Sequence, residues 1–235
     1  MEPRRIVRLA EVFAAQAPGP APLRLCAATS QLVDAAGVGL SLGASDEALD
    51  NGLQSVCSTD AGQDGEALQF DLGEGPSHTA HRTGRPVQAP DLDRDGIWPT
   101  FSAAATGVGI RAVFAFPLRS GSTSLGALTL YQHAAGELSS EQYADALTAS
   151  RFALNLLTAL QAGRPPEELD ALFTDGLSNS IEVHQASGIV SVQLGIPVAA
   201  ALAVMRAHAF AEGCSLAEVA AQVIDRRLKL GRIPD

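Results

Sequence analysis

The chain has 235 residues, 46% of them hydrophobic and 18% charged, which is enough for one large or two smaller domains with cores of their own. Its formal net charge of -10 excludes a general electrostatic attraction to nucleic acids or anionic membranes. No apolar run approaches the ~20 residues that span a bilayer, and the first five residues do not resemble a secretory signal. We therefore expect a cytoplasmic protein without membrane contact.

The charge is unevenly distributed along the chain. Residues 1–163 carry 10 Arg and 17 Asp or Glu, for a net charge of -7, whereas residues 181–235 carry five basic and five acidic residues and are neutral. Any contact with a polyanion is therefore expected in the C-terminal segment.

The N-terminal pattern predicts helices followed by strands. Apolar residues recur at helical steps over residues 4–17 and 23–36, and a Pro-Gly-Pro break separates the two predicted helices. A loop at residues 73–76 leads into a short helix that ends near Gly84. Strands are predicted at residues 38–42, 53–59, 87–89, 113–118 and 125–131, and a hairpin turn joins the last two.

A long helix is predicted from Ser139 to about Gln161, and its apolar residues form two adjacent seams. One seam can cover the sheet. The other could meet a second subunit, or both seams could be internal core. The Gly-Arg-Pro-Pro run at residues 163–166 then marks a domain boundary.

Several short motifs in the first 160 residues resemble, in order, the landmarks of a GAF domain. They are Leu72-Gly73-Glu74-Gly75-Pro76, Thr83-Gly84-Arg85-Pro86-Val87, Phe116-Pro117-Leu118 and Leu125-Gly126-Ala127-Leu128. The resemblance covers roughly residues 20–160. It implies an antiparallel sheet flanked by helices, in a regulatory module that binds a small molecule or holds a dimer together.

Five residues are candidates to line a ligand pocket in this domain: Ser77, His78, His81, Phe114 and Phe116. The sequence names neither the ligand nor a cofactor. His78 and His81 could face one metal or haem, but no third ligand lies nearby, so no metal site is predicted. The acidic run at residues 91–96 lacks the Glu that completes a calcium loop, because position twelve is Ser102. No motif for a catalytic nucleophile or a phosphate loop occurs, so no catalytic residue and no enzyme activity are predicted.

The C-terminal segment contains signals for three helices of about 14 residues each. Asn179 with Glu182 and Ser215 with Glu218 form capping pairs, Pro197 begins the middle helix, and Gly195, Gly213 and Gly231 end the three helices. An apolar stripe follows each helix, so the segment is expected to fold as a compact bundle.

This segment resembles the ANTAR domain, a three-helix RNA-binding module of bacterial transcription antiterminators. The resemblance rests on residues 184–190, on Ala200-Ala201-Leu202 with residues 205–209, and on residues 215–220. It implies binding to paired RNA stem-loops in nascent transcripts. A GAF domain followed by this module is also a familiar arrangement of actinobacterial regulators.

The candidate RNA-binding residues are Gln185, Ala186, Gly188, Arg206, His208, Arg226, Arg227 and Lys229. Helix packing could equally explain Ala186 and Gly188, and stabilisation of a helix C-terminus could equally explain Arg226, Arg227 and Lys229. Arg206 is the strongest single candidate because it lies in mid-helix, where the helix dipole does not explain a positive charge.

The sequence thus predicts an α+β protein with a GAF-like sensor at residues 1–162, a linker at 163–178 and an ANTAR domain at 179–235. The expected function is a homodimeric, signal-responsive antiterminator that binds RNA stem-loops. The alternative is a ligand-binding or dimerisation protein whose helical tail contacts a protein partner.

Overall fold

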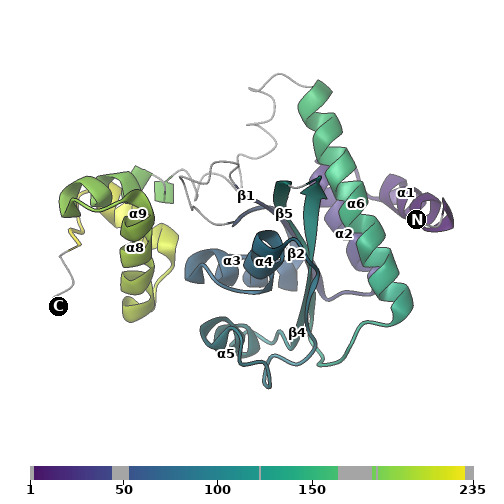
Figure 1. Cartoon of the computed structure of the whole chain (residues 1–235), viewed down its shortest axis with the longest axis horizontal. Helices are drawn as coiled ribbons and strands as arrows, with labels where there is room; N and C mark the ends of the chain where they lie inside the picture. The colour runs from purple at the N-terminus through teal and green to yellow at the C-terminus, as the bar shows by residue number, and fades with distance from the viewer. Residues whose placement is uncertain (1–2, 44–52, 122, 164–181, 184, 231–235) are drawn as a thin grey trace.

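The computed structural model describes residues 3–43, 53–121, 123–163, 182–183 and 185–230 (Figure 1). The described residues from 3 to 163, here called the N-terminal unit, form one sheet with helices on both faces. The described residues from 182 to 230, the C-terminal helices, lie beside it. Asn179, His184 and Gly231, on which the sequence analysis drew, and all of the predicted linker except Gly163 fall outside the described residues.

The sheet has five antiparallel strands in the order β2-β1-β5-β4-β3. Its central pairs bring apolar side chains together, for example Leu40 with Leu128 and Phe114 with Leu130. The turn between β4 and β5 contains Gly121 with φ +61°, as expected for a tight hairpin. The strands are β1 (Gly37–Gly43), β2 (Leu53–Asp60), β3 (Val87–Ala89), β4 (Ala112–Ser120) and β5 (Thr123–Gln132).

Helices α2 (Ala21–Val33) and α6 (Ser140–Gly163) cover one face of the sheet, and α1 (Pro3–Ala15) packs against these two helices. The buried face of α6 consists of small residues such as Ala146 and Ala149, which allow the helix to approach the sheet closely. Helix α1 packs against the flank of this face, where the rings of Phe13 and Phe152 lie 5.6 Å apart. The contacts of α6 with α1, α2 and the sheet thus belong to one core cluster.

An ion pair joins α1 to α6. Arg5 Nη1 lies 2.6 Å from Oδ1 of Asp145, whose side chain is only 2% exposed, and Arg8 Nη1 lies 3.7 Å from Oδ2 of the same carboxylate. A buried carboxylate needs such partners, because a charge without them is expensive to take out of water.

Helices α3 (Ala61–Leu72), α4 (Pro76–Thr83) and α5 (Pro99–Gly107) lie on the opposite face. The sequence pattern predicts α4 but neither α3 nor α5. Helix α3 approaches the sheet through two glycines: a Cβ at Gly62 would lie 2.5 Å from the carbonyl oxygen of Val38, and one at Gly65 would lie 2.1 Å from the Tyr131 ring. These glycines weaken the helical pattern in the sequence, yet the packing requires them.

The C-terminal helices are Gln185–Leu194, α8 (Val198–Glu212) and α9 (Leu216–Ile224). The predicted capping box at Ser215 and Glu218 is confirmed, and Gly213 ends α8 with φ +64°. The prediction that the last helix continues to Gly231 was wrong. Helix α9 ends at Ile224 because Arg226 takes a left-handed conformation, with φ +58°, and the chain turns there.

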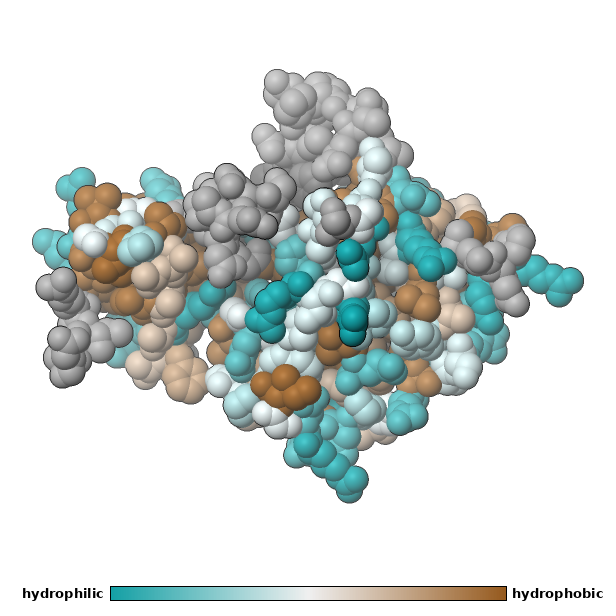
Figure 2. Space-filling view, viewed as in Figure 1, coloured by the Kyte–Doolittle hydropathy of each residue, from teal (hydrophilic) through white to brown (hydrophobic). Residues whose placement is uncertain are grey.

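Within the described ranges, no single helix is long and apolar enough to cross a membrane. The pair Gln185–Leu194 and Val198–Glu212, bent by 102°, passes that test only when both helices are taken together. Figure 2 shows apolar residues gathered over the C-terminal helices, and two of the most exposed large apolar side chains, Val192 and Phe210, belong to these helices.

Candidate functional sites

A cluster of buried polar side chains lies between the sheet and helices α3 and α4. Tyr131 Oη donates to Glu66 Oε1 at 2.7 Å and accepts from Gln69 Nε2 at 2.7 Å. Gln69 Oε1 accepts from the Ser77 backbone N–H at 2.8 Å, and the hydroxyls of Ser77 and Thr129 lie 3.0 Å apart. We call these five residues the polar cluster.

Two glycines make room for the cluster. A Cβ at Gly39 would lie 2.3 Å from Glu66 Oε1, and Gly65 lies directly against the Tyr131 ring. Any larger residue at either position would push a member of the cluster out of place.

Burial raises the pKa of Glu66 to about 7, although the hydrogen bond from Tyr131 acts in the opposite direction. Burial and the nearby Glu66 carboxylate likewise raise the pKa of Tyr131 well above its ordinary value. Near neutral pH the cluster can therefore gain or lose one proton at Glu66, inside the domain.

The predicted pocket residues do not all meet. Ser77 belongs to the polar cluster, whereas His78 Nε2 contacts the Gln69 carbonyl oxygen at 3.0 Å and His81 Nδ1 contacts Ser124 Oγ at 3.1 Å. Burial lowers the pKa of His81. Phe114 and Phe116 belong to the core on the other face of the sheet, under α2 and α6.

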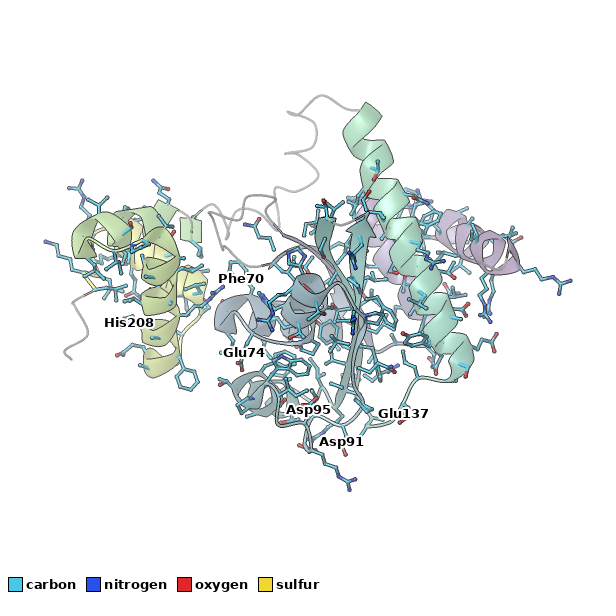
Figure 3. The ribbon with its side chains drawn as sticks, in the orientation of Figure 1. Phe70, Glu74, Asp91, Asp95, Glu137 and His208 are labelled. Carbon is cyan, nitrogen blue, oxygen red and sulfur yellow. The ribbon has the colours of Figure 1, made fainter. Side chains whose placement is uncertain are left out.

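Within the described part of the chain, no three His, Cys, Asp or Glu side chains gather as they would around a metal ion. The acidic loop predicted at residues 91–96 lies at the edge of the N-terminal unit, where Figure 3 labels Asp91 and Asp95. Arginines neutralise part of it: Arg94 lies 3.3 Å from Asp91, and Arg111 lies 3.1 Å from Asp93.

The three small-surface candidates of the first C-terminal helix occupy different environments. Gln185 is exposed, whereas Ala186 is fully buried in the core of the C-terminal helices. Gly188 is partly exposed, and a Cβ added there would meet no atom within 4 Å. Helix packing thus accounts for Ala186 but does not require a glycine at position 188.

The basic candidates after α9 are all exposed. Arg227 forms an ion pair with Asp225, while Arg226 and Lys229 extend from the turn that follows the helix. His208 is half-buried on α8 (Figure 3). Residues two positions apart on a helix are rotated by about 200° around its axis. His208 and Arg206 therefore leave α8 in nearly opposite directions.

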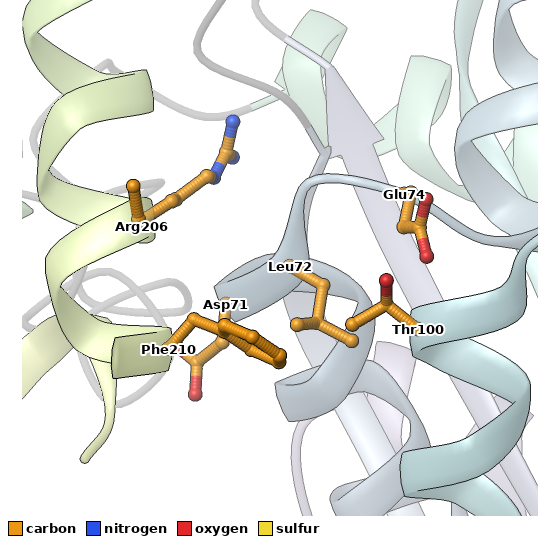
Figure 4. Close-up of a pocket in the computed structure, with 7 residues that line it drawn as sticks. Asp71, Leu72, Glu74, Thr100, Arg206 and Phe210 are labelled. Carbon is orange, nitrogen blue, oxygen red and sulfur yellow. The ribbon is translucent and has the colours of Figure 1, made fainter. Parts of the chain in front are cut away.

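Arg206 faces the N-terminal unit (Figure 4). Its Nη2 donates to the Phe70 carbonyl oxygen at 3.4 Å, near the end of α3. Beside it, a cleft of about 570 Å³ lies between α3, α5 and α8 and is lined by Leu72, Thr100 and Phe210 among others. The strongest RNA candidate from the sequence is therefore engaged in a contact between the two parts of the chain.

Sequence reasoning missed Glu66, Gln69 and Tyr131. Thr129 and Tyr131 are polar residues two positions apart in an otherwise apolar strand. Because residues two apart lie on the same face of a strand, this pattern predicts polar groups on one face of the sheet. Glu66 and Gln69 lie on the helix that the pattern did not predict, so nothing in the sequence analysis indicated their burial.

Comparison with protein families gives two matches: the family model described as GAF domain matches residues 24–150, and the one described as ANTAR domain matches residues 174–224. No curated protein matches the chain. Among solved structures, the GAF domain of a phosphoenolpyruvate-protein phosphotransferase from Coxiella burnetii is 13% identical with a TM-score of 0.50, covering 68% of this chain and 94% of its own. Free methionine-R-sulfoxide reductase from Neisseria meningitidis, in complex with its substrate, is 14% identical with a TM-score of 0.50, covering 68% and 89%. At these identities the likeness concerns the fold alone.

Proposed function

We propose a regulatory function for this chain, which belongs to the GAF domain family and carries an ANTAR domain after the GAF domain. In this proposal the GAF domain receives a signal and the ANTAR domain binds RNA. The RNA would be a pair of stem-loops in a nascent transcript, and binding would promote antitermination. The observation that carries the proposal is the ANTAR match over residues 174–224, because ANTAR is an RNA-binding antitermination module.

The surface chemistry of the C-terminal helices supports RNA as the partner. Arg226, Arg227 and Lys229 are exposed and can contact phosphates, and Gln185 beside the open surface at Gly188 offers a donor, an acceptor and space for a loop base. Because this segment is neutral overall, RNA binding would depend strongly on each individual cation. Pairing two such surfaces in a homodimer would double the cations on one RNA, and the dimer is part of the proposal.

The polar cluster supports a sensing role for the GAF domain. Its carboxyl, amide and hydroxyl groups could exchange their mutual hydrogen bonds for bonds to a small polar molecule. We infer a regulatory protein of actinobacterial type, located in the cytoplasm and without catalytic turnover, because GAF and ANTAR domains are usually not enzymes.

The test is a titration of the full chain with a transcript of two tandem stem-loops, against duplex DNA of equal length. We expect a preference for the RNA, and a loss of about tenfold or more in affinity when Arg226, Arg227 and Lys229 are all changed to Ala, with a weaker dependence on salt. The matched control changes Arg82, Arg85 and Arg94, which are exposed on the GAF domain, to Ala and removes the same three charges.

Equal losses in both triple variants would indicate a nonspecific charge effect and refute the assignment of the RNA surface. No preference for RNA over DNA, together with a specific protein captured by the C-terminal helices, would instead favour the partner-binding alternative. Sequencing the RNA that copurifies with the protein from its native host would identify the targets.

A further inference from the structure

The last turn of α3 binds the side chain of Arg206. The Phe70 carbonyl that accepts from Arg206 Nη2 is one of the last four of α3, which ends at Leu72, and these carbonyls lack partners within the helix. The negative end of the helix dipole at this point also favours the positive guanidinium.

The same guanidinium lies against Gly73, the residue that ends α3. A Cβ at Gly73 would lie 2.5 Å from Arg206 Cζ and 2.5 Å from Nη1, so only glycine leaves room for the guanidinium in this position. Gly73 also has φ +66°, which glycine adopts without strain.

A second contact runs in the opposite sense, from α3 to α9. Asp71 Oδ1 accepts from the Leu216 backbone N–H at 3.2 Å, and Leu216 is the first residue of α9. A carboxylate is favourable at the positive end of a helix, just as a guanidinium is at the negative end. The GAF and ANTAR domains thus each supply a charged side chain to a helix end of the other.

The contact is narrow and incompletely packed. Phe70 packs against the core of the ANTAR domain, but the 570 Å³ cleft next to Arg206 separates part of α8 from α3 and α5, which pack against each other. An interface beside an open cleft can separate more readily than a closely packed core.

The helix that makes these contacts also carries two of the five residues of the polar cluster, Glu66 and Gln69. Gln69 bonds to Tyr131 and Ser77 through its side chain, while its carbonyl oxygen accepts from the Gly73 N–H at 2.9 Å. A rearrangement of the cluster around a ligand would therefore act on the turn that holds Arg206.

We propose that the end of α3 is an intramolecular latch, formed by Phe70, Asp71 and Gly73 with Arg206 and Leu216, which holds Arg206 against the GAF domain and away from RNA. Opening the latch releases Arg206 to bind phosphate. This inference rests on the proposed RNA-binding function.

The test uses the full chain with Asp71→Ala, which removes the bond to the Leu216 N–H. Its matched control is Asp64→Ala, which removes the same charge from an exposed position in the first turn of α3. Two quantities are measured: amide hydrogen exchange of residues 213–219, which reports the latch without RNA, and affinity for the tandem stem-loop transcript.

For Asp71→Ala we expect faster exchange and an affinity about tenfold tighter, the size expected from one charge-assisted hydrogen bond. Asp64→Ala should change neither quantity. Asp71→Asn, which keeps the shape of the side chain and loses its charge, should give a smaller gain in affinity.

Faster exchange in Asp71→Ala with unchanged or weaker RNA affinity would overturn the latch while leaving RNA binding intact, and so would unchanged exchange. If the unaltered chain and all three variants fail to bind the transcript, RNA binding itself is refuted, and the latch with it.

Discussion

Replacing Glu66 with Gln tests whether the polar cluster contains a carboxyl group that stays protonated in the folded state. The substitution keeps the shape of the side chain, and the amide oxygen can still accept from Tyr131 Oη. It removes the ability of the group to ionise, which is the property that burial opposes.

The size and sign of the effect follow from the pKa. Burial raises the pKa of Glu66 from 4.5 to about 7, which corresponds to roughly 3 kcal/mol. Below pH 4.5 the group is protonated in both the folded and the unfolded chain. Between pH 4.5 and 7 the unfolded chain loses the proton while the folded chain keeps it, so the free energy of unfolding falls as pH rises. Above pH 7 the full loss is present.

The measurement is urea unfolding of the unaltered chain and of Glu66→Gln at pH 5, 6, 7 and 8. The difference between the two isolates Glu66 from other titrating groups: Glu66→Gln should gain relative stability as pH rises, by roughly 3 kcal/mol in total. Glu11→Gln, which removes a carboxylate from the exposed surface of α1, is the matched control. A difference that is flat from pH 5 to 8 would refute the buried, protonated carboxyl group.

Two further predictions concern the packing of the GAF domain. Arg5→Ala removes the 2.6 Å partner of the buried Asp145 and should lower the free energy of unfolding by about 1–3 kcal/mol, measured by urea unfolding. Gly65→Ala places a Cβ 2.1 Å from the Tyr131 ring and should cost at least about 1–3 kcal/mol, whereas Gly107→Ala, where the added Cβ meets no atom within 4 Å, should be nearly neutral in thermal melting. Equal stability of the two glycine variants would contradict the close approach of α3 to the sheet.

The strands could be predicted because the alternation of side chains is a local property. Residues 113–118 and 125–131 read as strands in the sequence, and both lie within β4 and β5. Helix α3 could not be predicted in the same way. Gly62 and Gly65 are required because the helix packs closely against the sheet. The residues of α3 are therefore determined by contacts with strands far away in the chain, which override local helix propensity.

The polar cluster was found only in part. Ser77 was a candidate because it follows the Gly-Pro entry into α4, and the structure brings it to Gln69 and Thr129. Phe114 and Phe116 were also pocket candidates, yet they share a side of β4 that faces away from Ser77. Which of the two faces of a sheet holds a site depends on which helices cover it, and strand periodicity does not specify this.

Arg206 shows the same limit at the level of domains. Its position in the middle of α8 separates it from a role at the end of its own helix. The structure places it at the end of another helix, α3, 136 residues away along the chain. Contacts between domains depend on how their surfaces meet, and helical periodicity does not contain that information.

The stability of the proposed latch determines how much free energy a ligand must supply to open it. Reversing a population from 99% docked to 99% released requires a ligand to prefer the released state by about 5.5 kcal/mol. A closely packed interface would demand more than a small ligand can supply through a few hydrogen bonds. Two polar contacts at helix ends beside an open cleft fall within that range. The narrow contact at α3 is therefore the kind of interface that rearrangement of a buried polar cluster could open.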